Sequence, residues 1–164
     1  MAMATTKTHY VPAGYHTTIP YLIIAKGRGA EALDWYKNNL GAKEIMRFPM
    51  PDGRLAHAEL QIGDSHVMLA DEYPDMGYVG PETLGGTSGL TMIYVPDSDA
   101  VFKQATSHGA KVVQELKDQF YGDRNGTLSD PFGHRWTVAT HIEDVTPEEM
   151  KRRMASMGKP GSCS

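Results

Sequence analysis

The most constraining feature of this sequence is an order of elements that occurs twice. The segment LGAKEI at 40–45 and the segment HGAKVV at 108–113 each end a helical stretch and begin an apolar run. A repeated unit that cannot bury its own sheet face must pair with its copy to make a continuous core. The repeat therefore predicts an α+β domain made of two similar modules.

The first module is predicted over residues 18–70. TIPYLIIA at 18–25 is short, apolar and β-branched, which favours a buried strand. In AEALDWYKNNLGAK at 30–43, apolar residues recur at helical spacing and Gly41 provides a helix stop. Three strands follow, joined by turns that contain Asp-Gly and Gly-Asp pairs. The predicted order is β-α-β-β-β.

The same order is predicted again over residues 90–142. LTMIYV at 90–95 is a strand, Ser98 is a good N-cap for the helix that follows, and Gly109 ends that helix. AKVVQEL, RNGTLSD and HRWTVATH are three further strands. Together the modules predict a cupped, eight-stranded mixed sheet with the helices outside and one cleft inside.

Three other segments complete the predicted organisation. Residues 1–17 form a loose N-terminal arm. Residues 71–89 hold five glycines and two prolines, so they are a linker, and a connection of this length can carry function or cover a site. Residues 143–164 form a C-terminal helix, which begins with a capping box at Thr146 and Glu149, and a flexible tail.

Composition narrows the class of protein. Hydrophobic residues make up 40% of the chain and charged residues 22%, which is typical of a packed globular protein. The net charge of −4, without a basic block, gives no support for nucleic-acid binding. The single cysteine, Cys163, excludes a disulfide framework. No signal-peptide pattern or membrane-spanning run is visible, so we expect a cytoplasmic protein with no membrane partner.

One strand of the first module carries polar residues at alternate positions. His57, Glu59 and Gln61 face one side of a strand, whereas Leu60 and Ile62 face the helices. A His-Glu pair can act as general acid and base, or help to hold a metal. The alternative is a polar cleft lining whose groups are only hydrogen-bonded.

The run QFYGDRNGTLSDPFGHRW at 119–136 combines a turn signal with candidate binding residues. Asp-Pro-x-Gly favours a tight turn. Asp123 and Arg124 are adjacent, so one of them points into the cleft. An arginine there would bind a carboxylate, phosphate or enolate oxygen, and the alternative is an arginine that anchors a loop carbonyl or a neighbouring acid. Phe120 and Tyr121 line the pocket or fill the core.

These segments resemble a known superfamily. Three segments carry the resemblance: ALDWYKNNLGAKE, GRLAHAELQIGDSHVMLAD and DQFYGDRNGTLSDPFGHRWTVATH. They are similar to segments of the vicinal oxygen chelate superfamily, which includes glyoxalase I, bleomycin-resistance proteins and extradiol dioxygenases. The resemblance covers residues 18–153 and is greatest to the PhnB-like branch. It implies paired β-α-β-β-β modules and a homodimer, in which the N-terminal arm and the C-terminal helix are candidates for exchanged contacts.

The resemblance also implies where a metal would bind. Enzymes of this superfamily hold a divalent ion, such as Zn, Ni, Mn or Fe, with two ligands from each module. The corresponding positions fall at Tyr21, at Glu59, near Leu90 or Thr91, and at Thr137. Only Glu59 keeps a common ligand type, so we expect an incomplete site with Glu59 as its one candidate ligand, and no cofactor is predicted firmly.

The other histidines are expected to have minor roles. His16 could supply a metal ligand if the first strand is shifted in register. His66, His134 and His141 are predicted to lie at the surface or in turns.

Three functions remain open, and the first is preferred. A glyoxalase-like or bleomycin-resistance-like protein would bind a small molecule in the cleft without the complete metal site. A metal-dependent lyase, isomerase or dioxygenase would stabilise an enediolate-like intermediate. A resistance protein would sequester a drug without chemistry. The predicted catalytic residues are Glu59 and His57, and the predicted substrate-binding residues are Tyr21, Met68, Met92, Tyr121, Arg124 and Thr137.

Overall fold

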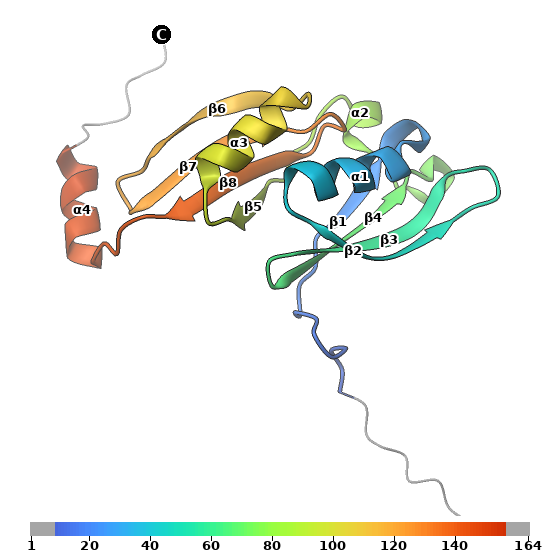
Figure 1. The fold of residues 1–164 in the computed structure, drawn as a ribbon, viewed down its shortest axis with the longest axis horizontal. Coiled ribbons are helices and arrows are strands. Elements are labelled where there is room, and N and C mark those ends of the chain that lie inside the picture. The colour runs from blue at the N-terminus through green and yellow to red at the C-terminus, as the bar shows by residue number, and fades with distance from the viewer. Residues whose placement is uncertain (1–8, 157–164) are drawn as a thin grey trace, which may run out of the picture.

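The computed structural model describes residues 9–156 and has the predicted α+β architecture (Figure 1). It contains two β-α-β-β-β modules that follow one another along the chain. The start of the predicted N-terminal arm, the end of the tail and Cys163 lie outside the described residues. No helix within 9–156 is long and apolar enough to cross a membrane.

Each module forms its own four-stranded mixed sheet. The strand orders are β1-β4-β3-β2 and β5-β8-β7-β6, and in each sheet the first and fourth strands of the module are parallel while the other pairs are antiparallel. The first module comprises β1 (Tyr21–Ile24), η1 (Ala25–Gly27), α1 (Gly29–Asn39), β2 (Lys43–Pro49), β3 (Leu55–Ile62) and β4 (Ser65–Asp71). The rest comprises η2 (Pro74–Met76), α2 (Pro81–Leu84), β5 (Thr91–Tyr94), α3 (Ser98–Ser107), β6 (Lys111–Asp118), β7 (Asp123–Ser129), β8 (Arg135–His141) and α4 (Pro147–Ser156).

The two sheets are joined through helices and a shared core rather than through a strand ladder. Figure 1 shows α1 and α3 beside one another, and the Trp35 indole N–H on α1 donates to the carbonyl of His108, 2.8 Å away, just after α3. Leu33 and Tyr36, two members of the predicted helical stripe, belong to a core cluster that includes Trp136 and Val138 of β8. The core therefore runs from one module into the other.

The Asp-Pro-x-Gly turn is confirmed, and its aspartate links the modules. One carboxylate oxygen of Asp130 accepts from the backbone N–H groups of Phe132 and His134, each at 2.9 Å. The other accepts from the Tyr36 hydroxyl of α1 at 2.7 Å and from the Trp136 indole at 2.9 Å. The predicted hairpin turn is thus also the point at which α1 is anchored to the second module.

The helix caps differ in part from prediction. Asp97, not Ser98, is the N-cap of α3, because its carboxylate accepts from the Ala100 backbone N–H at 2.9 Å. Ser98 is the first helical residue instead. At α4 the predicted cap is confirmed, since the Thr146 hydroxyl accepts from the Glu149 backbone N–H at 3.2 Å. The side chain of Glu149 binds Arg152 and Arg153 rather than turning back to the cap.

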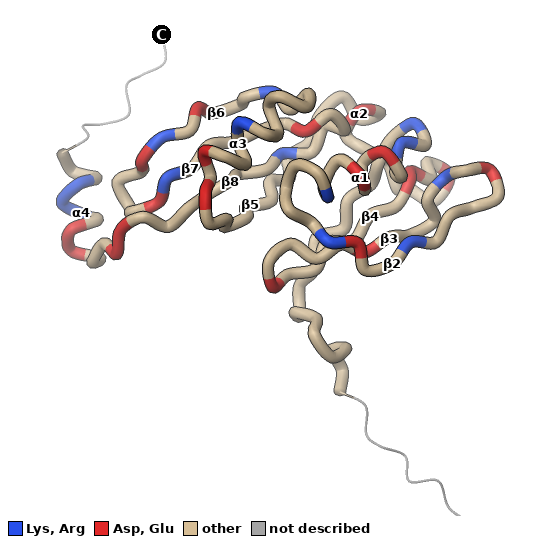
Figure 2. The backbone as a smooth tube through the Cα atoms, viewed as in Figure 1, with Lys and Arg blue, Asp and Glu red and all other residues tan. Residues whose placement is uncertain are grey.

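Charged residues of both signs are mixed along both modules and α4 (Figure 2). Most arginines are held by nearby carboxylates; Arg153 of α4, for example, binds Glu143 and Glu149. The described residues therefore present no continuous basic face of the kind that nucleic-acid-binding domains use.

Candidate functional site

In each module the sheet face away from the helices is the open face. The open face of the first module carries the predicted site residues of that module. Tyr21 lies on β1, His57 and Glu59 on β3, and Met68 on β4. Met68 is the direct neighbour of both Tyr21 and Glu59 in the sheet register. Residues at alternate positions on these strands are buried in the core. The alternation predicted for His57 and Glu59 is therefore what brings these four side chains together.

A chain of hydrogen bonds connects this group. The Tyr21 hydroxyl and His57 Nδ1 are 2.9 Å apart, and His57 Nε2 is 3.1 Å from Glu59 Oε1. The Tyr15 hydroxyl donates to Glu59 Oε2. This geometry suits the imidazole tautomer that accepts from Tyr21 at Nδ1 and donates to Glu59 at Nε2. Both oxygens of Glu59 are consequently in use.

The predicted arm is not loose where it meets the sheet. The Tyr15 ring stacks on the ring of His66 at 4.1 Å between centroids and covers the Glu59 side chain, which is only 6% exposed. His66 was expected at the surface, yet it is buried on β4 beneath Tyr15. The sequence offered no local signal for this contact, because Tyr15 lies outside every strand and helix.

Electrostatics keep Glu59 ionised. Burial alone would raise the pKa of this carboxyl group, but hydrogen bonds from Tyr15 and His57 outweigh burial and lower the pKa below its usual value of 4.5. Near neutral pH the group is a carboxylate beside an imidazole and a phenol. The chain from Glu59 through His57 to Tyr21 can accept a proton from a bound molecule and pass it along.

The donor set does not fit the divalent-metal site that the resemblance implies. Tyr15 and His57 already occupy both oxygens of Glu59. Nowhere in residues 9–156 do three His, Cys, Asp or Glu side chains converge in a way that could hold a metal ion. His16, the reserve ligand, instead lies 3.5 Å from the Ser65 hydroxyl. The side chains that the structure describes therefore do not assemble the implied ligand set.

The second module gathers a separate group of predicted residues. Met92, Tyr121 and Thr137 line one hollow of about 420 Å³, together with Asn125 and Thr127. The Thr127 and Thr137 hydroxyls are 2.9 Å apart, and the Asn125 amide donates to the Tyr121 hydroxyl at 2.8 Å. This hollow offers apolar contact and fixed hydrogen-bonding groups, but no first-module residue lines it.

Arg124 does not join this group. Its guanidinium lies on the helix side of β7, where it donates to Asp99 at 2.6 and 2.7 Å and to Asp118 at 2.8 Å. The prediction that Arg124 reaches a ligand in the cleft is wrong, and the alternative of an arginine that anchors a neighbouring acid is what the structure shows. Asp123 faces the open side instead, where it accepts from the Tyr94 hydroxyl at 2.7 Å.

Two of the remaining histidines also connect elements. His141 Nδ1 is 2.8 Å from Asp123, and its hydrogen bonds to Asp123 and Asp144 raise its pKa above the usual 6.5. His141 is exposed, as predicted. His134 does lie in the predicted turn, but its ring nitrogen is 3.0 Å from the backbone oxygen of Ile23 and so contacts the first module.

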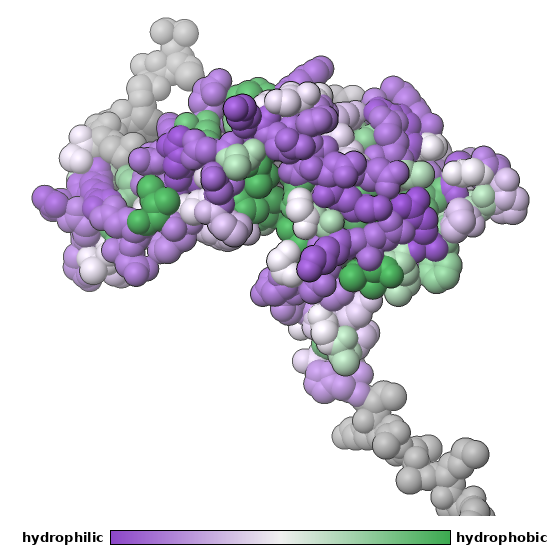
Figure 3. Space-filling view, in the orientation of Figure 1, coloured by the Kyte–Doolittle hydropathy of each residue, from purple (hydrophilic) through white to green (hydrophobic). Residues whose placement is uncertain are grey.

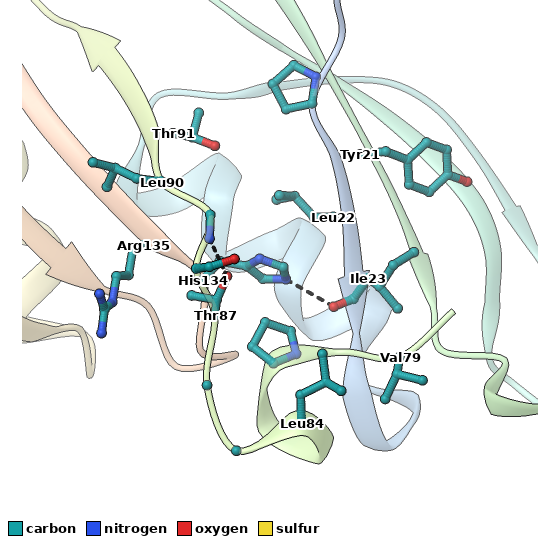
Figure 4. A pocket seen from close by; sticks show the side chains of 16 residues that line it. Tyr21, Leu22, Ile23, Val79, Leu84, Thr87, Leu90, Thr91, His134 and Arg135 are labelled. Atoms are coloured by element: carbon teal, nitrogen blue, oxygen red, sulfur yellow. Dashed lines mark hydrogen bonds between the residues drawn. The ribbon is translucent and has the colours of Figure 1, made fainter. Parts of the chain in front are cut away.

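The predicted single cleft is divided into several hollows. A hollow of about 480 Å³ lies on the first module and is lined by Tyr21, Ile23, Tyr73 and Tyr78, among others. Another, of about 700 Å³, lies between the modules, where β1 faces the glycine-rich end of the linker and His134 (Figure 4). Figure 3 shows hydrophobic surface, in green, between the modules and beside β2. The open sheet faces thus remain accessible.

Comparison with known proteins places the chain in a family. A family model described as the Glyoxalase/Bleomycin resistance protein/Dioxygenase superfamily matches residues 18–138, which span both modules. The chain belongs to this superfamily. The resemblance seen in the sequence is thereby confirmed. Since one fold of this kind hosts many activities, membership does not by itself identify the reaction.

Individual relatives agree with this assignment. An uncharacterized protein of Mycobacterium tuberculosis is 40% identical over 142 residues, covering 85% of this chain and 82% of that protein. The crystal structure of TioX from Micromonospora sp. ML1 is 28% identical with a TM-score of 0.56, covering 76% of this chain and 99% of TioX. The PhnB protein from Bacillus cereus, at 16% identity, shares the fold with a TM-score of 0.60 over 76% of this chain and 99% of its own.

Proposed function

We propose that this chain binds a small organic molecule against the open faces of its two sheets. The supporting observation is the apolar surface that these faces expose: Tyr21 is 48% exposed, Met92 42% and Tyr94 60%. Each of these side chains lies beside hydrogen-bonded polar groups, which is the usual make-up of a ligand site. Apolar surface gathered in this way commonly marks a site that a ligand or a partner covers.

We also propose that the chain acts as a homodimer. In the part of the chain that the structure describes, each open face exposes apolar side chains such as Tyr21 and Met92, and a second copy placed over it would enclose the hollow. The exposed apolar residues would then be shielded from water on both copies. Sedimentation velocity would give twice the 18.0 kDa mass of the chain, and a monomer at micromolar concentration would contradict this proposal.

Binding can be tested with phenylnaphthylamine, a neutral aromatic dye whose fluorescence rises in apolar surroundings. We expect saturable binding to the wild-type protein. Met92→Ala and Tyr121→Ala should each weaken it about tenfold, because each removes apolar contact from the second-module hollow. Met154→Ala is the matched control, since Met154 is an exposed methionine that lies on α4 and not on a strand of either sheet. No saturable signal, or equal effects of Met92→Ala and Met154→Ala, would contradict the proposal.

A second candidate function is proton transfer catalysed by Glu59. It is favoured by the hydrogen-bond chain from Glu59 through His57 to Tyr21, which ends at the open face. A ligand with an acidic C–H group next to a carbonyl could lose that proton to the Tyr21 oxygen, while Tyr21 passes its hydroxyl proton to His57 Nδ1 and His57 passes its Nε2 proton to Glu59. His57 would orient the carboxylate and share the proton afterwards.

This candidate predicts a specific loss in Glu59→Gln. The wild-type protein is incubated in D2O with a panel of hydroxycarbonyl and ketoacid compounds. It should catalyse exchange of the C–H proton of at least one compound for deuterium, which NMR detects. Glu59→Gln should slow that exchange by about 10²–10⁴-fold while dye binding stays within twofold. Hydrogen bonds from Tyr15 and His57 lower the pKa of Glu59, so protonation of this carboxylate should slow the wild-type reaction only at a lower pH than for an ordinary glutamate.

The same comparison separates catalysis from sequestration. If Glu59→Gln exchanges as fast as wild type, the carboxylate is not the base. If no compound exchanges at all but Met92→Ala still loses the dye, the protein binds without chemistry, as a sequestering protein would.

A further inference from the structure

We propose that the ligand carries an anionic oxygen group and that Arg135 binds this group in the second-module hollow. The inference rests on the proposed small-molecule function and adds the chemical class of the ligand. The sequence had predicted that Arg124 binds such an oxygen, but Arg124 lies on the helix side of β7 and pairs with Asp99 and Asp118. Arg135 was not considered, although a signal existed: it precedes Trp136, a large aromatic residue expected in the core.

The position of Arg135 follows from strand alternation. It is the first residue of β8, and the next residue, Trp136, is buried in the core. Arg135 and Thr137 therefore share the opposite, open face. Both line the hollow of about 420 Å³. In Figure 4 the Arg135 side chain points away from His134 and from Tyr21.

The charge of Arg135 has no carboxylate partner in the described residues. Every other arginine of residues 9–156 forms an ion pair with Asp or Glu, whereas Arg135 forms none. The only acid that shares an adjoining hollow with it is Glu82, and the oxygens of Glu82 are held by Lys26 at 3.1 Å and Arg28 at 3.2 Å. An anionic ligand would supply the missing partner.

The surroundings of Arg135 suit the rest of such a ligand. Arg135 is the one charged residue that lines the hollow. A guanidinium offers two parallel donors to a carboxylate, phosphate or sulfonate, and such charge-assisted pairs are stronger than neutral hydrogen bonds. The other lining residues provide hydroxyl and amide groups for polar atoms and apolar side chains for a hydrocarbon or aromatic body: Ser88, Gly89, Leu90, Met92, Val113, Gln114, Tyr121, Asn125, Thr127 and Thr137.

The first module offers no equivalent anion site. Its open face carries the Glu59 carboxylate, which would repel an acid. Asp123, an acid on the open face of the second module, is held by Tyr94 and His141 and does not line the hollow. The acidic end of a ligand is therefore directed to the second module, beside Arg135.

Two dyes of the same aromatic body test this inference. Anilinonaphthalene sulfonate carries an anionic group, and phenylnaphthylamine does not. In Arg135→Gln, we expect sulfonate binding to weaken about 10- to 100-fold, because a charge-assisted pair is lost, and binding of the neutral dye to stay within twofold. Arg135→Lys should recover part of the sulfonate affinity. Arg124→Gln is the matched control and should leave both affinities unchanged, because Arg124 is paired on the helix side.

The outcomes separate this inference from the proposed function. If both dyes bind and Arg135→Gln weakens neither, or weakens both equally, the anion site is wrong and small-molecule binding stands. If Arg124→Gln weakens the sulfonate as much as Arg135→Gln, the effect is one of net charge and the site is again wrong. If neither dye binds the wild-type protein, the proposed function fails and this inference fails with it.

Discussion

Replacing Asp130 with alanine is expected to lower the free energy of unfolding by about 3–5 kcal/mol. The carboxylate is only 5% exposed and accepts four hydrogen bonds, from the Phe132 and His134 backbone and from the Tyr36 and Trp136 side chains. Alanine would leave these donors in the interior without an acceptor. The link between α1 and the second module would be lost at the same time.

Urea denaturation at neutral pH, followed by tryptophan fluorescence, would measure this loss. Asp130→Asn should recover less than half of the lost free energy. The NH2 group of asparagine cannot accept hydrogen bonds, so two of the four donors would face another donor. Asp99→Ala is the control, since Asp99 is an exposed acid paired with Arg124, and its loss should be far smaller. Equal losses for Asp130→Ala and Asp99→Ala would show that the buried carboxylate does not hold the modules together.

Gly122→Ala is the second change with a large expected effect, a loss of about 2–4 kcal/mol in the free energy of unfolding. Gly122 has φ of +97°, and a Cβ added there would overlap the backbone oxygen of Glu143. The backbone cannot easily move aside, because the Gly122 carbonyl accepts from the N–H groups of Ile142 and Glu143 at 2.9 and 3.0 Å. Alanine therefore brings both conformational strain and a steric clash.

Gly53→Ala isolates the two contributions. Gly53 also has positive φ, at +86°, but nothing lies within 4 Å of an added Cβ. This control should show only the cost of the left-handed conformation, about 1–2 kcal/mol. Thermal and urea unfolding of both variants would give the difference. If the two glycines cost the same, the contact between the turn at Gly122 and the segment after β8 is not tight.

Local patterns in the sequence are sufficient to predict the helices and strands of this protein and the faces of its strands. Helical spacing placed Leu33 and Tyr36 in the core, and alternation placed His57 and Glu59 on one face of β3. The repeated order of elements predicted the two modules. These features depend on interactions between residues close in the chain, or on a period that any strand or helix must follow.

Which side chains share a site depends instead on contacts between distant parts of the chain. Strand alternation requires Asp123 and Arg124 to face opposite sides of the sheet, but it does not say which of them faces α3. The structure places Arg124 on the helix side, where it pairs with Asp99 of α3. Gly126 is on the same side and lies against Phe102 of α3. Tyr15 reached Glu59 across 44 residues of chain. Likewise, the two sheets share no strand pairing and are joined by contacts of α1 with the second module. Such contacts join residues far apart in sequence, so no local pattern can specify them.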